Sequence, residues 1–311
     1  MKRKMLNVPK GGYDGMKGFT IVEFLVAGLL SIIVLIAVVS SYFTSRKLND
    51  AANERLAIQQ DLRNAATLIV RDARMAGSFG CFNMSEHTEK DVVFDVAQKN
   101  RPFSLKGSSA NKLIPIAESL NIGYQGFAQV RLALIFQYGI DDVNASAETT
   151  VVSSCGVISK PGKQIPTLED AKKELKIQNS GKEQNGNIAR QRHVVNAYAV
   201  GRIAGEEGLF RFQLDDKGKW GNPQLLVKKV KRMDVRYIYV SGCPEDAGKE
   251  EQFKYTDKFD KSRDAVTPAG VEVLLDSGLG AKIAASSDNS IYAYRINATI
   301  RGGNVCANRT L

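Results

Sequence analysis

A single acid interrupts the longest apolar stretch of the sequence, and its chemistry requires a partner. Between Phe19 and Phe43 the only charged residue is Glu23. A carboxylate inside such a segment costs about 2.5–3.5 kcal/mol on membrane-insertion scales. Because a buried charge is tolerated only when it is paired, we expect Glu23 to meet a cationic group in the working protein. The alternative is that Glu23 lies near one end of the segment and simply reaches the membrane surface.

Four cysteines are the second set of residues with their own chemistry. A basic segment precedes the apolar run, which predicts that the N-terminus stays in the cytoplasm and the rest of the chain is exported. An even number of cysteines on the exported side predicts two disulfides. Four buried free thiols are the alternative. The cysteines are Cys81, Cys155, Cys243 and Cys306.

We expect the disulfides to be Cys81–Cys155 and Cys243–Cys306. Cys81 directly follows a long predicted helix and Cys155 ends an early predicted strand, so this bond would connect the helix to the sheet. The second bond would join the ends of two late strands. The two other pairings stay open, because four cysteines allow three connectivities.

The remaining polar residues do not form a catalytic pattern. His87 and His193 are isolated, and the sequence has no phosphate-binding glycine loop, HExxH, CxxC or nucleophile elbow. The acid pairs 141–142 and 215–216 lack the spacing of a calcium-binding EF-hand loop, so we expect solvated turn residues. We therefore expect a protein that is not an enzyme and that uses no cofactor and no metal.

The first predicted secondary-structure element is one long helix, which contains Glu23 and ends shortly before Cys81. The apolar run of residues 19–43 is long enough to span a membrane and exceeds the apolar core of an ordinary signal peptide. A plain membrane anchor would explain the length of the run, though not its acid. Residues 44–76 continue as an amphipathic helix without proline, and Gly77 and Gly80 end it. The predicted apolar stripe comprises Leu48, Ala52, Leu56, Gln59, Leu62, Ala66, Ile69, Ala73 and Ala76, and the predicted polar side includes Asp72.

Residues 77–311 have the composition of a β-rich globular head. Strands are predicted at 130–139, 149–155, 193–203, 208–214, 225–240 and 291–302, with a hairpin turn at 205–208 and a polar turn at 215–223. Residues 156–192 and 244–290 are polar excursions, the first with a short helix at 168–175. The predicted fold class is α+β: a long N-terminal helix packed on an antiparallel β-sheet head.

The segment Lys17-Gly18-Phe19-Thr20-Ile21-Val22-Glu23 resembles the processing and assembly signal of type IV prepilins. The resemblance implies that residues 1–18 are a leader that a prepilin peptidase removes after Gly18, and that Phe19 becomes the N-methylated first residue. Glu23 is then the fifth residue of the mature chain. In that family it serves assembly, and the partner it requires would be the Phe19 amine of a neighbouring subunit.

Further motifs resemble one branch of this family. ARMAGSFGC (73–81), SSC (153–155), GLFRF (208–212) and VKRMDVRYIYV (230–240) are similar to PilW-type minor pilins, in particular the PilJ variant. These correspond to the J minor pseudopilin of type II secretion. The resemblance implies a pilin-like fold and a single pass through the bacterial inner membrane, with the head in the periplasm. It also implies a complex with other minor pilins and the major pilin that primes pilus assembly, at the tip or base of the filament.

The rival interpretation is a pilus subunit whose main role is to bind DNA or a host receptor. Basic residues cluster near two tyrosines, and the chain has a net charge of +10. Residues 1–18 hold +4 of that charge, so the remainder is only mildly basic, and lysines on a strand edge are more often solvated. The residues concerned are Arg190, Arg192, Lys228, Lys229, Lys231, Arg232, Tyr237 and Tyr239.

Overall fold

The computed structural model describes residue 18 and residues 20–93, 112–176, 187–241, 252–259, 266–276, 294–301 and 303. The chain forms two units, residues 1–57 and residues 58–311. A long apolar helix begins in the first unit, and a large β-rich region makes up most of the second, which agrees with the predicted α+β class. Phe19, Cys243 and Cys306 lie outside the described residues.

The predicted N-terminal helix is present as α1 (Ile21–Met75). It ends where expected, because Gly77 adopts φ +79°, a conformation that glycine takes without strain. The amide of Gly77 donates to the carbonyl of Gln137 at 2.8 Å, which ties the end of the helix to a strand. From Ile21 to Ala57 every residue is exposed in the single chain, and by length and composition the helix could cross a membrane.

The buried face of α1 is shorter than the predicted stripe and lies partly on other residues. Its buried residues are Ile58, Leu62, Ala65, Ile69, Asp72 and Ala73, and Ala76 just after the helix is also buried. From Ile58 to Asp72 the spacings are three and four residues. Leu48 and Leu56, which the prediction included, are exposed. Asp72, predicted on the polar side, is fully buried. That prediction was wrong because the face that packs is set by the sheet it meets, as described below.

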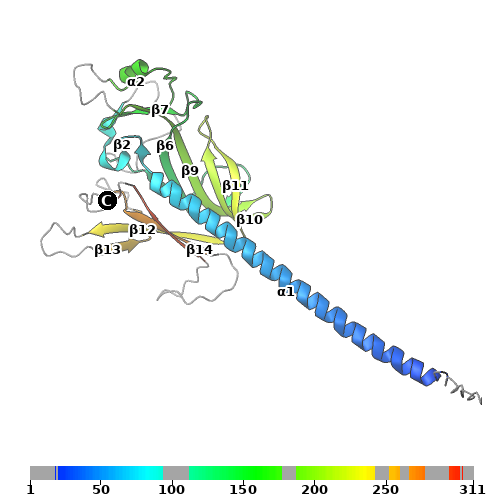
Figure 1. The fold of residues 1–311 in the computed structure, drawn as a ribbon. Helices are drawn as coiled ribbons and strands as arrows, with labels where there is room; N and C mark the ends of the chain where they lie inside the picture. The colour runs from blue at the N-terminus through cyan, green and yellow to red at the C-terminus, as the bar shows by residue number, and fades with distance from the viewer. Residues whose placement is uncertain are drawn as a thin grey trace, which may run out of the picture. The chain divides into compact units, whose positions relative to one another are not determined.

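A nine-stranded sheet forms the larger part of the head (Figure 1). Its central strand β9 pairs with β10 along one edge, while β5, β6 and β7 share the other edge. All pairs are antiparallel except β3 with β8. The strands are β3 (Val92–Val93), β4 (Ile116–Ser119), β5 (Phe127–Gln129), β6 (Ala133–Ile140), β7 (Thr150–Ser153), β8 (Ile158–Ser159), β9 (Ala189–Ile203), β10 (Glu206–Leu214) and β11 (Trp220–Lys228).

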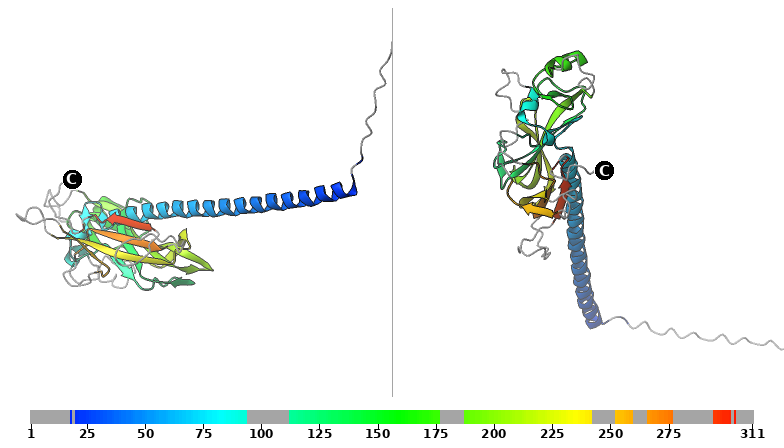
Figure 2. Two further views of the ribbon diagram at one scale, coloured as in Figure 1. Left: turned by 90° about the horizontal axis from the view of Figure 1, so that it is seen from below. Right: turned by 90° about the vertical axis from the view of Figure 1, so that its left-hand side faces the viewer.

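A separate four-stranded antiparallel sheet follows in the order β13-β12-β14-β15. Figure 2 shows its strands together with the last turns of α1. One apolar cluster joins α1 from Ile58 onward to side chains of both sheets, so the helix end and the two sheets share a core. The strands are β12 (Arg232–Ser241), β13 (Gln252–Thr256), β14 (Gly270–Asp276) and β15 (Tyr294–Thr299).

Short elements complete the described chain. After α1, β1 (Ser78–Phe79) and β2 (Phe82–Asn83) form a small hairpin, followed by single-turn 3-10 helices at Met84–Glu86 and Glu89–Asp91. The predicted short helix is present as α2 (Leu168–Glu174), which Thr167 caps by accepting from the amide of Asp170.

Several strand predictions are confirmed, and others are corrected. The hairpin of β9 and β10 is present, but its turn is Ala204–Gly205, both at positive φ, and residues 206–208 of the predicted turn belong to β10. The predicted strand 225–240 is instead β11 and β12, which lie in different sheets. Lys229 takes φ +61° between them and ends the first ladder. The excursion 244–290 contains β13 and β14, so it is not simply a polar connection.

The polar turn at 215–223 is also shorter than predicted. Asp215 accepts hydrogen bonds from the amides of Lys217 and Lys219, and β11 then begins at Trp220. Pro223 therefore lies inside a strand. It is tolerated because β11 is the edge strand of the nine-stranded sheet, where an amide donor is not needed on the outer side.

Candidate functional site

The N-terminal end of α1 places Glu23 in a capping box. The amide and the hydroxyl of Thr20 donate to Glu23 Oε2 at 3.0 and 3.1 Å, and the amide of Glu23 donates to Thr20 Oγ1 at 3.3 Å. This reciprocal pattern satisfies helix-end amides and sets the first turn. The T-x-x-E motif in the sequence is the usual signature of such a capping box. Glu23 therefore has a local role at the start of the helix, in addition to the pairing role expected from its apolar surroundings.

In the apolar part of α1 and just after it, two hydroxyl side chains form their hydrogen bonds within the helix and do not require water. Ser31 and Thr44 donate their hydroxyls to the carbonyls four residues earlier, at 2.7 and 2.9 Å. Such bonds satisfy polar side chains inside the helix itself. The large apolar side chains between Ile21 and Phe43 are 42–80% exposed in the single chain. A surface of this kind marks contact with lipid or with other apolar helices.

The buried carboxylate of Asp72 is the centre of a polar cluster between α1 and the sheet. Asp72 Oδ1 accepts from the hydroxyl of Tyr138 at 2.9 Å, and Oδ2 accepts from the hydroxyl of Tyr198 at 2.6 Å. The side-chain amide of Asn196 donates to Oδ2 at 2.9 Å. Arg211 Nη2 lies 3.4 Å from Oδ2. We call these five residues the Asp72 cluster.

The cluster compensates the burial of the acid with charge and with directed donors. Asp72 is fully buried, and the Arg211 side chain is 13% exposed, so their ion pair is largely shielded from water. Arg71 adds a second guanidinium at 3.2 Å. Burial and the neighbouring carboxylate raise the pKa of Tyr138 to about 12, so this hydroxyl stays a donor at ordinary pH. The arrangement fixes the rotation of α1 against β6, β9 and β10.

The spacing of the buried face is compatible with Asp72 but does not by itself identify it, because a step of three from Ile69 reaches Asp72 and a step of four reaches Ala73. Counting in steps of three or four from Ile58 reaches Ile69, and the next step can lead to either position. The sequence prediction grouped Asp72 with the exposed acids because of its residue type. A charged residue on a packing stripe indicates a buried polar partner set, here supplied by β6, β9 and β10.

The predicted disulfide between Cys81 and Cys155 is present in the structure. It links the segment after β1 to the end of β7, next to a hydrogen bond from the Ser153 hydroxyl to the Phe79 carbonyl at 2.7 Å. Gly80 permits this close approach, since a Cβ there would lie 2.8 Å from Cβ of Ala189. The predicted bond between Cys243 and Cys306 lies outside the described residues.

Removing this disulfide should destabilise the head substantially. The bond closes a loop of 74 residues, and the chain-entropy model assigns such a loop about 4 kcal/mol. We expect the Cys81→Ala/Cys155→Ala double variant to lose about that much free energy of unfolding, measured by urea denaturation of the detergent-solubilised chain. A Ser85→Ala variant, in the same region without a disulfide role, is the control. A loss below about 1 kcal/mol would contradict the assignment of a stabilising cross-link.

His193 is a buried neutral side chain. It is 1% exposed, its Nε2 lies 3.2 Å from Gln137 Oε1, and its ring packs 5.5 Å from that of Phe79. Burial lowers the pKa of His193 to about 3. It therefore stays uncharged in the folded head at neutral pH. His87 is different, because it is partly exposed, stacks on Phe82 and lies 3.5 Å from Asp91.

His193 should make the head acid-sensitive. The folded-state pKa of about 3 lies below the ordinary value of 6.5, so the unfolded state gains the proton first as pH falls. Stability should be lost between pH 6.5 and 3, by about 2–3 kcal/mol at pH 4.5. The difference in unfolding free energy between pH 7.5 and 4.5 should shrink in His193→Gln and persist in the control His87→Gln. Equal pH dependence in all three proteins would contradict this.

Of the two tyrosines in the basic cluster considered for nucleic-acid binding, Tyr239 is half-buried and Tyr237 has no accessible ring. Tyr237 is fully buried and donates its hydroxyl to Glu118 Oε1 at 2.6 Å. Lys228 lies 3.7 Å from Glu206, and Arg192 lies 3.6 Å from Asp142. Base stacking needs an exposed ring. Tyr237 therefore cannot act as a stacking platform, although the lysines at 228–231 remain on the surface.

One acid of each pair, Asp142 and Asp215, serves a turn, as predicted for the pairs. Asp142 Oδ1 accepts from the amide of Asn144 at 2.9 Å, and Asp215 closes the turn described above. Asp141 accepts from the side-chain amide of Gln191 at 3.0 Å. Among the residues that the structure describes, no group of three or more His, Cys, Asp or Glu side chains is placed to hold a metal ion.

Comparison of the chain with protein-family models, with curated proteins and with solved structures finds no match.

Proposed function

We propose that this chain is a PilW-type minor pilin that joins other minor pilins in a complex priming type IV pilus assembly. The observation that carries the proposal is the exposed apolar helix with a charged residue, Glu23, in its first turn. From Ile21 to Ala57 no residue of α1 is buried by its own chain. Its apolar part, from Ile21 to Phe43, must be covered by lipid before assembly and by neighbouring helices afterwards.

The position of Glu23 supports an assembly role. Its Oε2 takes both hydrogen bonds from Thr20, which leaves Oε1 for a donor from another subunit. Cleavage after Gly18 would create an amine on Phe19, a cation that an apolar helix bundle otherwise lacks. Pairing of this amine with Glu23 of a neighbour would relieve two charge penalties at once and select one register of packing.

The head supports the same proposal in a different way. The Asp72 cluster and the Cys81–Cys155 bond attach the end of α1 and the segment after it to the large sheet. A helix that inserts into a filament must transmit its position to the head, and a buried polar cluster does so more specifically than apolar contacts alone. This is the mechanical requirement of a pilin-like fold.

The proposal carries a defined location and set of partners. The chain would insert in the bacterial inner membrane once, with residues 77–311 in the periplasm, where disulfides form. A prepilin peptidase would process it, and other minor pilins and the major pilin would contact it in the complex.

The mature N-terminus tests the proposal. We expect mass spectrometry of the protein from producing cells to find a chain that begins with N-methylated Phe19. Gly18→Ser should block cleavage, whereas Gly15→Ser, which changes a glycine away from the junction, should be processed normally. A mature chain that begins at Ser40 or Ser41 would instead identify an ordinary signal peptide and overturn the proposal.

A further inference from the structure

Half of β12 has an open edge. On one side, β14 pairs with β12 from Arg232 to Ile238. On the other side, β13 pairs with β12 only from Tyr237 to Ser241. No described strand therefore pairs with the second edge of the segment Arg232–Arg236. Such an edge presents backbone donors and acceptors that an additional strand can use.

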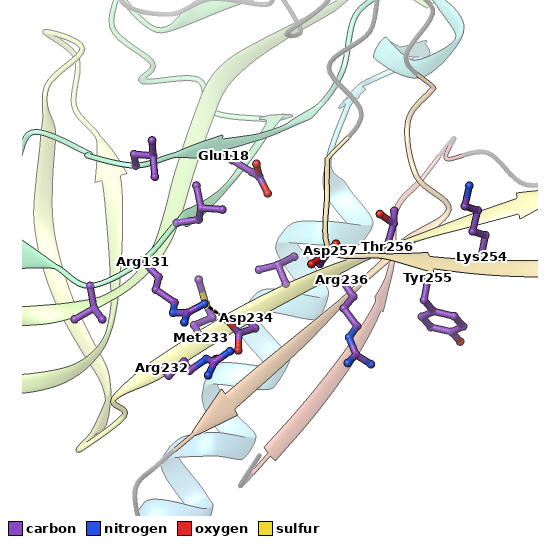
Figure 3. Close-up of a pocket in the computed structure, with 14 residues that line it drawn as sticks. Glu118, Arg131, Arg232, Met233, Asp234, Arg236, Lys254, Tyr255, Thr256 and Asp257 are labelled. Carbon is purple, nitrogen blue, oxygen red and sulfur yellow. Dashed lines mark hydrogen bonds and ion pairs between the residues drawn. The ribbon is translucent and has the colours of Figure 1, made fainter. Parts of the chain in front are cut away.

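A cleft of about 860 Å³ follows this open edge (Figure 3). Residues 232–236 of β12 form one wall, and the segment 130–132 before β6 together with Glu118 and Leu120 forms the opposite wall. Residues 254–257, at the end of β13, close one end. An extended segment of five residues is about 17 Å long, and a cleft of several hundred Å³ is of the size that holds a bound ligand.

Four cations and three acids line the cleft, so the lining carries a net charge of +1; they are Arg131, Arg232, Arg236 and Lys254 against Glu118, Asp234 and Asp257. Asp234 accepts from Arg131 Nη1 at 2.8 Å and also pairs with Arg232. The side chains of Arg131 and Arg232 are 50% and 43% exposed, so both remain accessible to a ligand. One carboxylate thus serves two guanidinium groups, each of which keeps part of its surface exposed.

Arg236 lies two residues beyond Asp234 along β12, and its partners include Glu272. The buried Glu272 lies 3.6 Å from Arg236 and 3.2 Å from Arg295. Again one carboxylate is shared by two arginines. The exposed Lys254 adds a further cation to the lining. These positions favour a ligand with carboxylates, and arginine forks match carboxylates well.

Apolar side chains alternate with these cations. Leu120 and Val130 line the wall opposite β12 and are 81% and 53% exposed, and Tyr255 at the end of β13 is 56% exposed. A strand added at the open edge would turn successive side chains to opposite faces. One face would meet the arginines together with Tyr255, whose strand partner Ile238 is two residues beyond Arg236. The other face would meet Met233 and Val235.

We propose that this cleft binds an extended, acidic segment of a partner protein, which adds as a strand to the edge of Arg232–Arg236. The occupant is a different protein and not a second copy, because this chain carries a net charge of +10 and is not a source of excess acid. Backbone pairing supplies the binding, and the arginines select acidic side chains. This inference does not depend on the proposed pilus function.

Synthetic peptides of alternating glutamate and valine are the probe, measured by fluorescence anisotropy against the full chain in detergent. We expect them to bind at least about tenfold more tightly than matched lysine–valine peptides. Methylation of every second peptide amide should weaken binding about tenfold in one register and little in the other, because only alternate amides face β12. Equal binding of both peptides, equal effects of both methylation registers or no binding would overturn the proposal.

Variants of the chain locate the site. Lys254→Glu should weaken binding of the glutamate–valine peptide by about tenfold, while Lys217→Glu, the same charge change in the exposed turn before β11, should leave it unchanged. A photoreactive benzoylphenylalanine in place of Val130 should cross-link the peptide, and one in place of the exposed Val143 should not. Equal cross-linking from both positions, or an equal loss with both lysine variants, would contradict a site at β12.

Discussion

Replacing Asp72 with alanine should lower the free energy of unfolding of the head by about 3–5 kcal/mol, because it removes one partner of a buried ion pair. Arg211 would remain in the core without its carboxylate, at 13% side-chain exposure. The hydroxyls of Tyr138 and Tyr198 and the amide of Asn196 would lose their acceptor at the same time. Buried donors without acceptors pay their full desolvation cost.

Thermal unfolding followed by near-ultraviolet circular dichroism measures this effect. For a domain of this size we expect the midpoint to fall by roughly 10 °C in Asp72→Ala. Asp72→Asn keeps the shape and one acceptor but removes the charge. Its unfolding midpoint should lie between those of Asp72→Ala and the wild type. Asp50→Ala on the exposed part of the same helix is the control and should change stability by at most about 0.5 kcal/mol. An Asp72→Ala protein as stable as this control would mean that the cluster does not hold the helix.

The Asp72 cluster also shows where sequence reasoning succeeds and where it stops. The existence and end of α1 followed from local chemistry: no proline occurs in it, and Gly77 is free to take φ +79°. Its buried face did not follow, because that face depends on which residues of β6, β9 and β10 lie opposite. Tyr138 and Tyr198 are far from residue 72 in the sequence, and only the fold brings them together.

Strand prediction failed where a single residue changes the path of the chain. Residues 225–240 have continuous β character, and nothing in the type of Lys229 indicates its φ of +61°. The opposite error occurred at β14, whose inward-facing Val271, Val273 and Leu275 do alternate. Glu272 between them resembled part of a polar loop, but it is buried between arginines of β12 and β15.

Among the candidate site residues, those with local or covalent chemistry were the easiest to predict. The pairing of Cys81 with Cys155 followed from the positions of the two residues at the ends of predicted elements, and it is present. The T-x-x-E motif is sufficient to predict the capping role of Glu23. We predicted only a cationic partner for Glu23 from the sequence, because the residue lies in an apolar segment. The cleft beside β12 could not be predicted, because it exists only where β13 stops pairing with β12, and the length of that pairing is not evident from the sequence.

The largest functional effect is expected from Glu23→Val. The variant should still enter the membrane, because its helix is more apolar than before. Under the proposed minor-pilin function, filament formation and recovery of partner pilins should be lost, because the amine of Phe19 in a neighbouring subunit would have no carboxylate to pair with. Electron microscopy of pili and co-purification of the membrane complex provide the two measurements. Normal piliation would mean that the acid does not select the packing register.

The capping box allows the charge of Glu23 to be separated from its local hydrogen bonds. Glu23→Gln keeps an oxygen that can accept from Thr20 and removes only the charge, since glutamine also serves in this motif. Thr20→Val does the reverse, removing the hydroxyl that bonds Glu23 while leaving the carboxylate. If the charge pairs between subunits, Glu23→Gln should abolish assembly as Glu23→Val does, and Thr20→Val should retain it. If Glu23 serves only to begin its own helix, Glu23→Gln should assemble normally and Thr20→Val should be the defective protein. The two outcomes are opposite, so one comparison decides whether the acid at the start of α1 acts within the chain or between chains.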